Sequence, residues 1–345
     1  MFDNFFGSRD AVIALEQMQS SGRMPQTILL DGPEGVGKAT LARRVAARLL
    51  GHNEWIEQDD LSLEHNRQVV AEREKMAPEK RSEDPLLFAT HPDFVTFCPD
   101  GPLRQISIQQ MRLLKERAQF GPMKGRHRVF LIDAIDRANE QASNSLLKTL
   151  EEPPPYLIFF LTAENPYDLL PTIRSRSVPL RLSRLSDAEM REFARRRSLQ
   201  EPERRIALAG GSPGLAVQLD LEAYDRRRGA MLDLLRAAAG VTQFSDWART
   251  SEKIAAARTE KLEPYLRVLY LLLEDLLHLR EGIGEIRNPD VRIDLENLAG
   301  ATSFAWLREA MRKTDELIEL LRRNIQKNIA LDAAVLQLRQ YAGAR

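Results

Sequence analysis

The chain has 345 residues, of which 43% are hydrophobic, and its 50 basic residues are balanced by 50 acidic ones. This length allows two or three domains with ordinary cores, and the balanced charge excludes a global attraction to nucleic acid, so any DNA contact requires a local basic patch. The single cysteine, Cys98, excludes a disulfide framework, and the absence of a long apolar run or signal-peptide pattern predicts a cytoplasmic protein without membrane contact.

The first strong motif follows a short apolar run near the N-terminus. Residues 27–31 (TILLD) predict a strand, residues 32–40 (GPEGVGKAT) a glycine-rich loop, and residues 41–50 a helix. Strand, loop and helix in this order are the context that a P-loop requires. The sequence therefore predicts a nucleotide-phosphate site formed by Gly32, Gly35, Val36, Gly37, Lys38, Ala39 and Thr40.

The chemistry of this loop indicates good phosphate binding but weak metal binding. Glycines let backbone N–H groups turn toward phosphate oxygens, Lys38 adds a positive charge, and the helix N-terminus adds its dipole. In a P-loop the residue after the lysine carries a hydroxyl that binds Mg²⁺, but this chain has Ala39. Thr40 lies one step further, and whether it reaches a metal stays open. We expect ATP or ADP as ligand, with Mg²⁺ at Thr40 and Asp133 only when nucleotide is bound.

Residues 52–86 are polar and charged, and they predict a helical insertion from about residue 60 to residue 79 with a solvated face. The two histidines of the insertion, His52 and His65, have no cysteine or histidine partners that would complete a four-ligand site. We therefore expect no structural zinc.

The next predicted elements are a strand at residues 93–98 and an amphipathic helix at residues 108–119. Basic residues on this helix and in the loop after it are Arg112, Lys115, Arg117, Lys124, Arg126 and Arg128. Two interpretations stay open for these residues, namely ordinary solubilising charge and a face that contacts DNA phosphates.

The segment from residue 128 to residue 182 has the densest pattern. It predicts buried strands at 129–132 and 156–162, a third short strand at 178–182, and a helix at 139–150 that two glutamates and three prolines terminate. Strands that alternate with helices form a parallel sheet, whose ligands lie at the carboxyl ends of the strands. Asp133, directly after the first of these strands, is therefore expected beside a phosphate–metal complex.

Three stretches carry a family resemblance: SLLKTLEEPP at 145–154, LLPTIRSRS at 169–177 and Asp-Ala-x-Asp at 133–136. They resemble the bacterial clamp-loader subunits of DNA polymerase III, which are AAA+ proteins. The resemblance implies an α/β P-loop AAA+ domain with a parallel sheet, then a helical lid and an all-α collar. The implied boundaries are 1–182 (with the insertion at 52–86), 183–221 and 222–345.

The resemblance also implies partners and a role. It implies assembly with gamma/tau and delta subunits and action on the sliding clamp and primed DNA during replication. The resemblance further places a phosphate-sensing polar residue near 162–165, whose identity the sequence leaves open.

Three departures from the family's motor subunits bear on enzymatic activity. Active AAA+ ATPases carry Asp-Glu at the strand end, and this chain has Ala134 after Asp133; loss of a positioned base costs roughly 10²–10⁴-fold in rate. Ala39 removes a metal ligand, and residues 213–215 (Pro-Gly-Leu) offer no lid arginine. These features favour the delta-prime class, a stator with weak or no ATPase activity of its own. The gamma/tau-type motor ATPase is the alternative.

Arg176 is the residue with the sharpest functional expectation. It lies in Ser175–Arg176–Ser177, which matches the family's Ser-Arg-Cys motif with serine in place of cysteine. The resemblance implies an arginine finger that reaches the γ-phosphate held by a neighbouring subunit. The alternative is a surface arginine at a helix C-terminus, where positive charge is mildly favourable.

From Tyr224 onward the pattern is helical. Leucines at 262–276 and apolar residues at 307–325 recur at spacings of three and four, and residues 328–341 resemble the last helix of clamp-loader collars. A plain helical bundle and an oligomerisation collar both fit this pattern.

Overall fold

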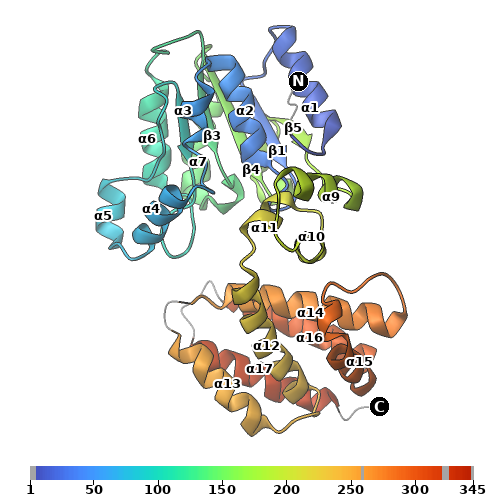
Figure 1. Ribbon diagram of the computed structural model, residues 1–345. Helices are drawn as coiled ribbons and strands as arrows, with labels where there is room; N and C mark the ends of the chain where they lie inside the picture. The colour runs from blue at the N-terminus through green and yellow to red at the C-terminus, as the bar shows by residue number, and fades with distance from the viewer. Residues whose placement is uncertain (1–4, 258–259, 321–325, 343–345) are drawn as a thin grey trace. The chain divides into compact units, whose positions relative to one another are not determined.

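The computed structural model describes residues 5–257, 260–320 and 326–342. Their contacts divide the chain into two compact units, each with its own core (Figure 1). The first unit comprises Met1–Gln200 and Gly210–Gln218, and the second comprises Glu201–Ala209 and Leu219–Arg345.

The first unit is built on a five-stranded sheet in the order β2-β3-β4-β1-β5, with all neighbours parallel. The strands are β1 (Thr27–Asp31), β2 (Phe94–Phe97), β3 (Arg128–Ile132), β4 (Leu157–Ala163) and β5 (Val178–Arg181). Each apolar run singled out in the sequence is a strand, because the inner strands of a covered parallel sheet are buried on both faces. The predicted α/β fold with a parallel sheet is thereby confirmed.

Helices cover both faces of the sheet. They are α6 (Ile108–Ala118) and α7 (Glu140–Glu151) on one face, and α1 (Arg9–Ser20) and α2 (Lys38–Leu50) on the other. Successive residues of a strand point to opposite faces of the sheet. In β1, Leu29 packs toward α6 and α7, while Ile28 and Leu30 pack toward α1 and α2. The sheet therefore separates two apolar cores.

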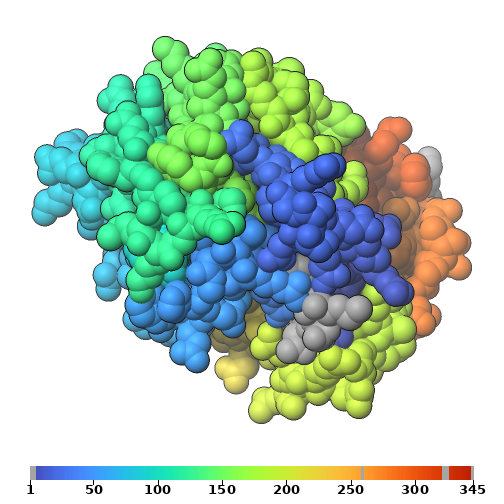
Figure 2. Space-filling model, turned by 90° about the horizontal axis from the view of Figure 1, so that it is seen from above, coloured from blue at the N-terminus to red at the C-terminus, as the bar shows by residue number. Residues whose placement is uncertain are grey.

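The insertion forms three short helices, α3 (Asn53–Glu57), α4 (Glu64–Glu74) and α5 (Pro78–Glu83). The sequence predicted one helical excursion over about 60–79. Pro78 divides it, because the residue before a proline disfavours helical backbone, and Ala77 is extended at φ −60° and ψ 145°. The insertion, in cyan, projects from one edge of the face in Figure 2.

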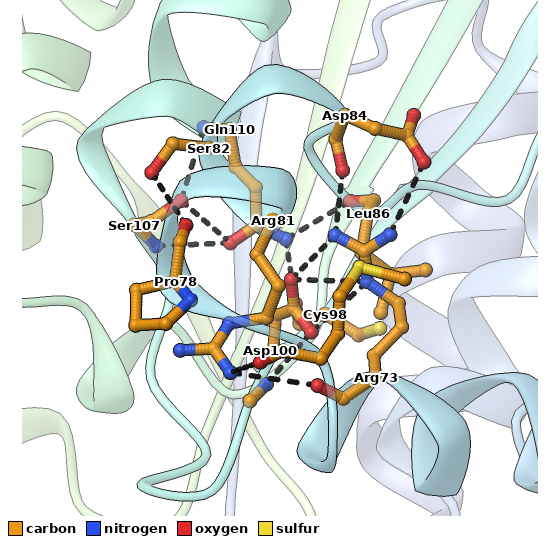
Figure 3. A network of polar contacts seen from close by, with 12 residues as sticks. Arg73, Pro78, Arg81, Ser82, Asp84, Leu86, Cys98, Asp100, Ser107 and Gln110 are labelled. Carbon is orange, nitrogen blue, oxygen red and sulfur yellow. Dashed lines mark hydrogen bonds and ion pairs between the residues drawn. The ribbon is translucent and has the colours of Figure 1, made fainter.

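A buried arginine anchors this insertion to the loop that follows β2 (Figure 3). Arg73 Nε donates to Asp100 Oδ1 at 3.1 Å, Arg73 Nη2 donates to Asp100 Oδ2 at 2.8 Å, and Nη2 also donates to the Asp84 carbonyl oxygen. The two side chains of the Arg73–Asp100 pair are 6% and 9% exposed. The charge pattern of the insertion, interpreted from the sequence as a solvated face, is therefore buried in part.

The region predicted as the lid contains α9 (Asp187–Arg196), α10 (Pro202–Ala209) and α11 (Pro213–Gln218). Ser186 and Glu189 form a capping box at the start of α9, which satisfies otherwise unpaired N–H groups. Helices α9 and α11 belong to the first unit and α10 to the second. The predicted domain boundaries of the lid stay a prediction.

The second unit is helical throughout its described residues. Its helices include α12 (Leu221–Ala238), α13 (Phe244–Ala256), α14 (Glu263–Glu281), α15 (Arg292–Ala301), α16 (Phe304–Leu320) and α17 (Lys327–Ala342). The leucines of α14 and both Trp247 and Trp306 form its core. The predicted pattern at 307–325 extends past α16 into 321–325, which lie outside the described residues. No helix among the described residues is long and apolar enough to cross a membrane.

Shorter helical elements complete the fold. They are α8 (Pro171–Arg174), η1 (Ile135–Arg137), η2 (Pro166–Asp168) and η3 (Pro289–Val291). Helix α8 is the element whose C-terminal end Arg176 follows.

Candidate functional site

The carboxyl ends of three neighbouring strands bring the predicted phosphate-binding residues to one edge. Strand β4 lies between β1 and β3, so the glycine loop after β1, Asp133 after β3 and Glu164 after β4 share that edge. Gly32 N donates to Ala163 O at 3.1 Å, which joins the start of the loop to the end of β4.

The loop adopts a conformation that only glycine takes readily. Gly32, Gly35 and Gly37 have φ angles of 146°, 75° and 101°, a region that strains residues with a Cβ. A Cβ on Gly32 would lie 2.1 Å from the backbone oxygen of Leu182. The glycines of the loop are therefore structurally required, as expected for the phosphate cradle that the sequence predicts.

Lys38 lies within this cradle. Its Nζ donates to Gly32 O at 2.6 Å and to Pro33 O at 2.7 Å. Burial lowers the pKa of Lys38, and the carboxylates of Glu164, Asp133 and further residues oppose that shift. A bound phosphate would give this partly buried cation a direct counter-charge.

Asp133 is held by the neighbouring strand. Thr162 Oγ1 donates to Asp133 Oδ1 at 2.5 Å and accepts from Ala134 N at 2.8 Å. Within the window 162–165, Thr162 is thus the residue whose side chain contacts Asp133. Its signal was its position at the end of a buried strand. Which residue of this window senses phosphate stays a prediction.

Glu164 is a second side chain at this edge that the sequence did not single out. Burial raises the pKa of its carboxyl, and the negative charge of Glu34 acts in the same direction. Its backbone N–H donates to Asp136 Oδ2 at 2.8 Å. Asp136, two residues beyond Ala134, is thereby engaged in holding the end of β4.

The residues at this edge are less suited to bind Mg²⁺ than to bind phosphate. Ala39 packs against the apolar core on the α2 side of the sheet and offers no ligand atom. The Asp133 carboxylate already accepts from Thr162, and Thr40 lies in the first turn of α2. The residues present therefore fit a nucleotide phosphate, and for Mg²⁺ they supply Asp133 and the Thr40 hydroxyl without the usual first hydroxyl.

The start of α11 packs directly on the loop. Gly214 N donates to Gly35 O at 2.8 Å, and a Cβ on Gly214 would lie 2.9 Å from that oxygen. A Cβ on Gly35 would lie 3.0 Å from Leu215 N. Residues 213–215, which offer no lid arginine, thus form a close backbone contact with the loop.

Arg176 lies on the surface of the first unit, with its side chain 34% exposed. Its Nη1 donates to Thr172 O at 3.0 Å and to Ser175 Oγ at 3.4 Å, and its Nη2 donates to Glu151 Oε1 at 2.9 Å. Ser177, in the place of the family's cysteine, donates through Oγ to Ile173 O at 2.8 Å. The contact with Thr172 O is the one expected of an arginine near a helix C-terminus. The ion pair with Glu151 is a further contact, which the position at the helix end does not require.

The structure separates the basic residues that the sequence grouped as a possible DNA face. Arg128 is buried, and its Nη1 donates to Arg117 O at 2.7 Å and to Phe120 O at 2.9 Å. Lys124 Nζ lies 4.2 Å from the ring centroid of Trp55. Arg128 is therefore structural, whereas Arg112, Lys115 and Arg126 are exposed.

We expect purified protein to contain no stoichiometric zinc. Within the ranges that the structure describes, no three His, Cys, Asp or Glu side chains are grouped to hold a metal ion. Burial raises the pKa of the Cys98 thiol, and only a thiolate is a good ligand. Elemental analysis by mass spectrometry, with a zinc-finger protein prepared in parallel, checks this expectation; one zinc per chain would refute it.

Comparisons with known proteins agree with these features. The family model for "DNA polymerase III, delta subunit" matches residues 7–186. DNA polymerase III subunit delta' of Pseudomonas aeruginosa is 27% identical over 342 residues, which cover 93% of this chain and 94% of that protein. Subunit delta' of Escherichia coli is 27% identical over 258 residues, or 73% of this chain and 75% of that one.

Similarity to gamma and tau subunits covers less of the chain. DNA polymerase III subunit gamma of Buchnera aphidicola is 29% identical over 192 residues, which cover 56% of this chain and 48% of that protein. The delta-prime relatives thus match most of the chain, and the gamma relative matches about half. The chain belongs to the DNA polymerase III delta-subunit family and is a delta-prime-type clamp-loader subunit.

Proposed function

We propose that this chain is the stator of a DNA polymerase III clamp loader. It assembles with gamma/tau and delta subunits and helps to load the sliding clamp on primed DNA in the cytoplasm. The main support is a well-formed phosphate cradle that lacks hydrolytic groups, with Ala39 and Ala134 at the positions of the metal hydroxyl and the catalytic carboxylate. Co-purification with the other subunits, followed by native mass measurement, tests the assembly.

In this proposal the chain's own site binds nucleotide without turning it over. The backbone N–H groups of the loop and the Lys38 ammonium hold the phosphates, and Asp133, fixed by Thr162, is available to a nucleotide-bound Mg²⁺. The methyl side chain of Ala134 can neither deprotonate nor orient a water molecule. Bound ATP or ADP then stabilises the first unit rather than driving a cycle.

The isolated chain is accordingly expected to hydrolyse ATP well below about 1 s⁻¹, the lower end of the ordinary range for kinases. Steady-state hydrolysis is measured with and without primed DNA. Lys38→Ala serves as the control that assigns any residual activity to this loop. A DNA-stimulated rate of about 1 s⁻¹ or more, lost in Lys38→Ala, would support the motor ATPase alternative.

We also propose that residues 222–345 carry subunit assembly. In the second unit Ile329 and Leu336 are 59% and 50% exposed, and they lie seven residues apart on α17, hence on one face of the helix. Truncation after residue 221 is expected to abolish co-purification with the other subunits.

A full-length variant guards against misfolding of the truncated chain, because Leu208 packs into the core of the second unit. Ile329→Asp with Leu336→Asp should reduce association while leaving the circular dichroism spectrum unchanged. Ile283→Asp, at a residue 56% exposed in the same unit, should have little effect. Stoichiometric co-purification of the truncated chain would contradict an assembly role for this region.

A further inference from the structure

The ion pair between Arg176 and Glu151 joins two elements that are not adjacent in the chain. Glu151 is the last residue of α7, and Arg176, 25 residues later, follows α8. Arg176 Nη2 and Glu151 Oε1 are 2.9 Å apart, and the two side chains are 34% and 45% exposed. The pair therefore lies at the surface, where neither charge is needed to satisfy a buried partner.

The position of Glu151 is electrostatically unfavourable for its own helix. The C-terminal end of a helix carries partial negative charge, so a carboxylate there is mildly destabilising. Glu152 follows as the C-cap residue of the same helix, which places a second carboxylate nearby. The stability of α7 thus gives no reason for a glutamate at position 151, whereas Arg176 does.

The contacts of Arg176 hold the plane of its guanidinium from two sides. Thr172 O and Ser175 Oγ accept from Nη1, and Glu151 Oε1 accepts from Nη2. A guanidinium has five N–H donors, so these three contacts leave donors for an incoming anion. The guanidinium makes three contacts and is still exposed, which differs from an arginine that is buried in the fold.

We propose that Glu151 is a positioning residue for Arg176. It holds the guanidinium ordered at the surface, so that the arginine meets the phosphate of a neighbouring subunit without first losing its rotamer freedom. The inference rests on the proposed role of Arg176 as a finger supplied in trans. The effect is modest, because an exposed ion pair changes an equilibrium by about fivefold at most.

The test is a double-mutant cycle in the reconstituted complex. Glu151→Gln keeps the size of the side chain and removes its charge, and Glu152→Gln is the matched control one residue away. We expect Glu151→Gln to lower kcat for DNA-stimulated ATP hydrolysis about threefold to fivefold with KM for ATP unchanged. Glu152→Gln should behave like the wild type. In an Arg176→Ala background, Glu151→Gln should have no further effect.

The outcomes separate this inference from the proposed function. If Arg176→Ala lowers the rate while Glu151→Gln leaves it unchanged or raises it, positioning by Glu151 is wrong and the finger stands. An equal loss from Glu151→Gln in both backgrounds would mean a merely structural role and would also overturn it. If Arg176→Ala has no effect, the finger itself is refuted, and positioning by Glu151 falls with it.

Discussion

Arg176→Ala is expected to slow ATP hydrolysis at the neighbouring nucleotide site of the assembled clamp loader by about 10³-fold or more, the usual contribution of an arginine finger. Negative charge develops on the phosphoryl group as it is transferred, and a permanently charged, planar guanidinium stabilises it. The observed rate of the complex falls by the share of turnover that depends on that site. Clamp loading on primed DNA should fall with it.

The design separates chemistry from folding. Arg176 is one-third exposed, and its contacts are two with its own turn and one exposed ion pair with Glu151. Arg176→Ala should therefore assemble normally and unfold close to the wild-type temperature, because an exposed ion pair contributes about 1 kcal/mol at most. Arg176→Lys should restore little activity, because an ammonium lacks the two-pronged geometry of a guanidinium. Arg174→Ala is the matched control from the same turn. The Arg174 side chain stacks on Tyr167, with Cζ 5.1 Å from the centroid of the ring, so its removal also takes away one arginine and one surface contact.

Two measurements on the reconstituted complex decide the matter. DNA-stimulated hydrolysis is followed in the steady state, and clamp loading is followed with a labelled clamp and primed template. Wild-type values of both in the Arg176→Ala complex would exclude the trans role and leave the surface-arginine interpretation.

Arg73→Met is expected to destabilise the insertion by about 3–5 kcal/mol, the usual result of removing one partner from a buried ion pair. Asp100 would keep its charge at a position 9% exposed and lose the two-pronged contact with the guanidinium. Methionine keeps much of the apolar length of arginine, so the loss reports on charge and hydrogen bonds more than on packing.

Hydrogen exchange is the suitable measurement, because local opening of one segment need not unfold the whole chain. Amides of α4 and α5 should lose protection by a factor of about 10² or more. Arg67→Met is the matched control on the same helix, as Arg67 is 52% exposed and pairs with Glu64, a contact worth about 0.5 kcal/mol or less. Equal protection in the two variants would show that Arg73 does not anchor the insertion.

The sequence by itself determined the sheet and the loop. A parallel sheet that is covered on both faces requires continuous apolar runs. In a chain with 29% charged residues, the runs at 27–31, 129–132 and 156–162 therefore predict buried strands. The glycine loop could also be predicted from the sequence, because phosphate binding requires backbone angles that glycine adopts without strain. Both depend on neighbours within a few residues, so local reasoning was sufficient.

Only the tertiary structure decided which charged side chains are buried and which residues they pair with. Arg67 and Arg73 occupy the same helix, yet one is solvated and the other buried against Asp100, 27 residues later. Arg176 pairs with Glu151, 25 residues earlier in the chain, because α7 packs against α8. Which charge is buried or paired depends on the direction of a side chain and on residues brought close by the fold. Residue type and spacing along the chain do not contain that information.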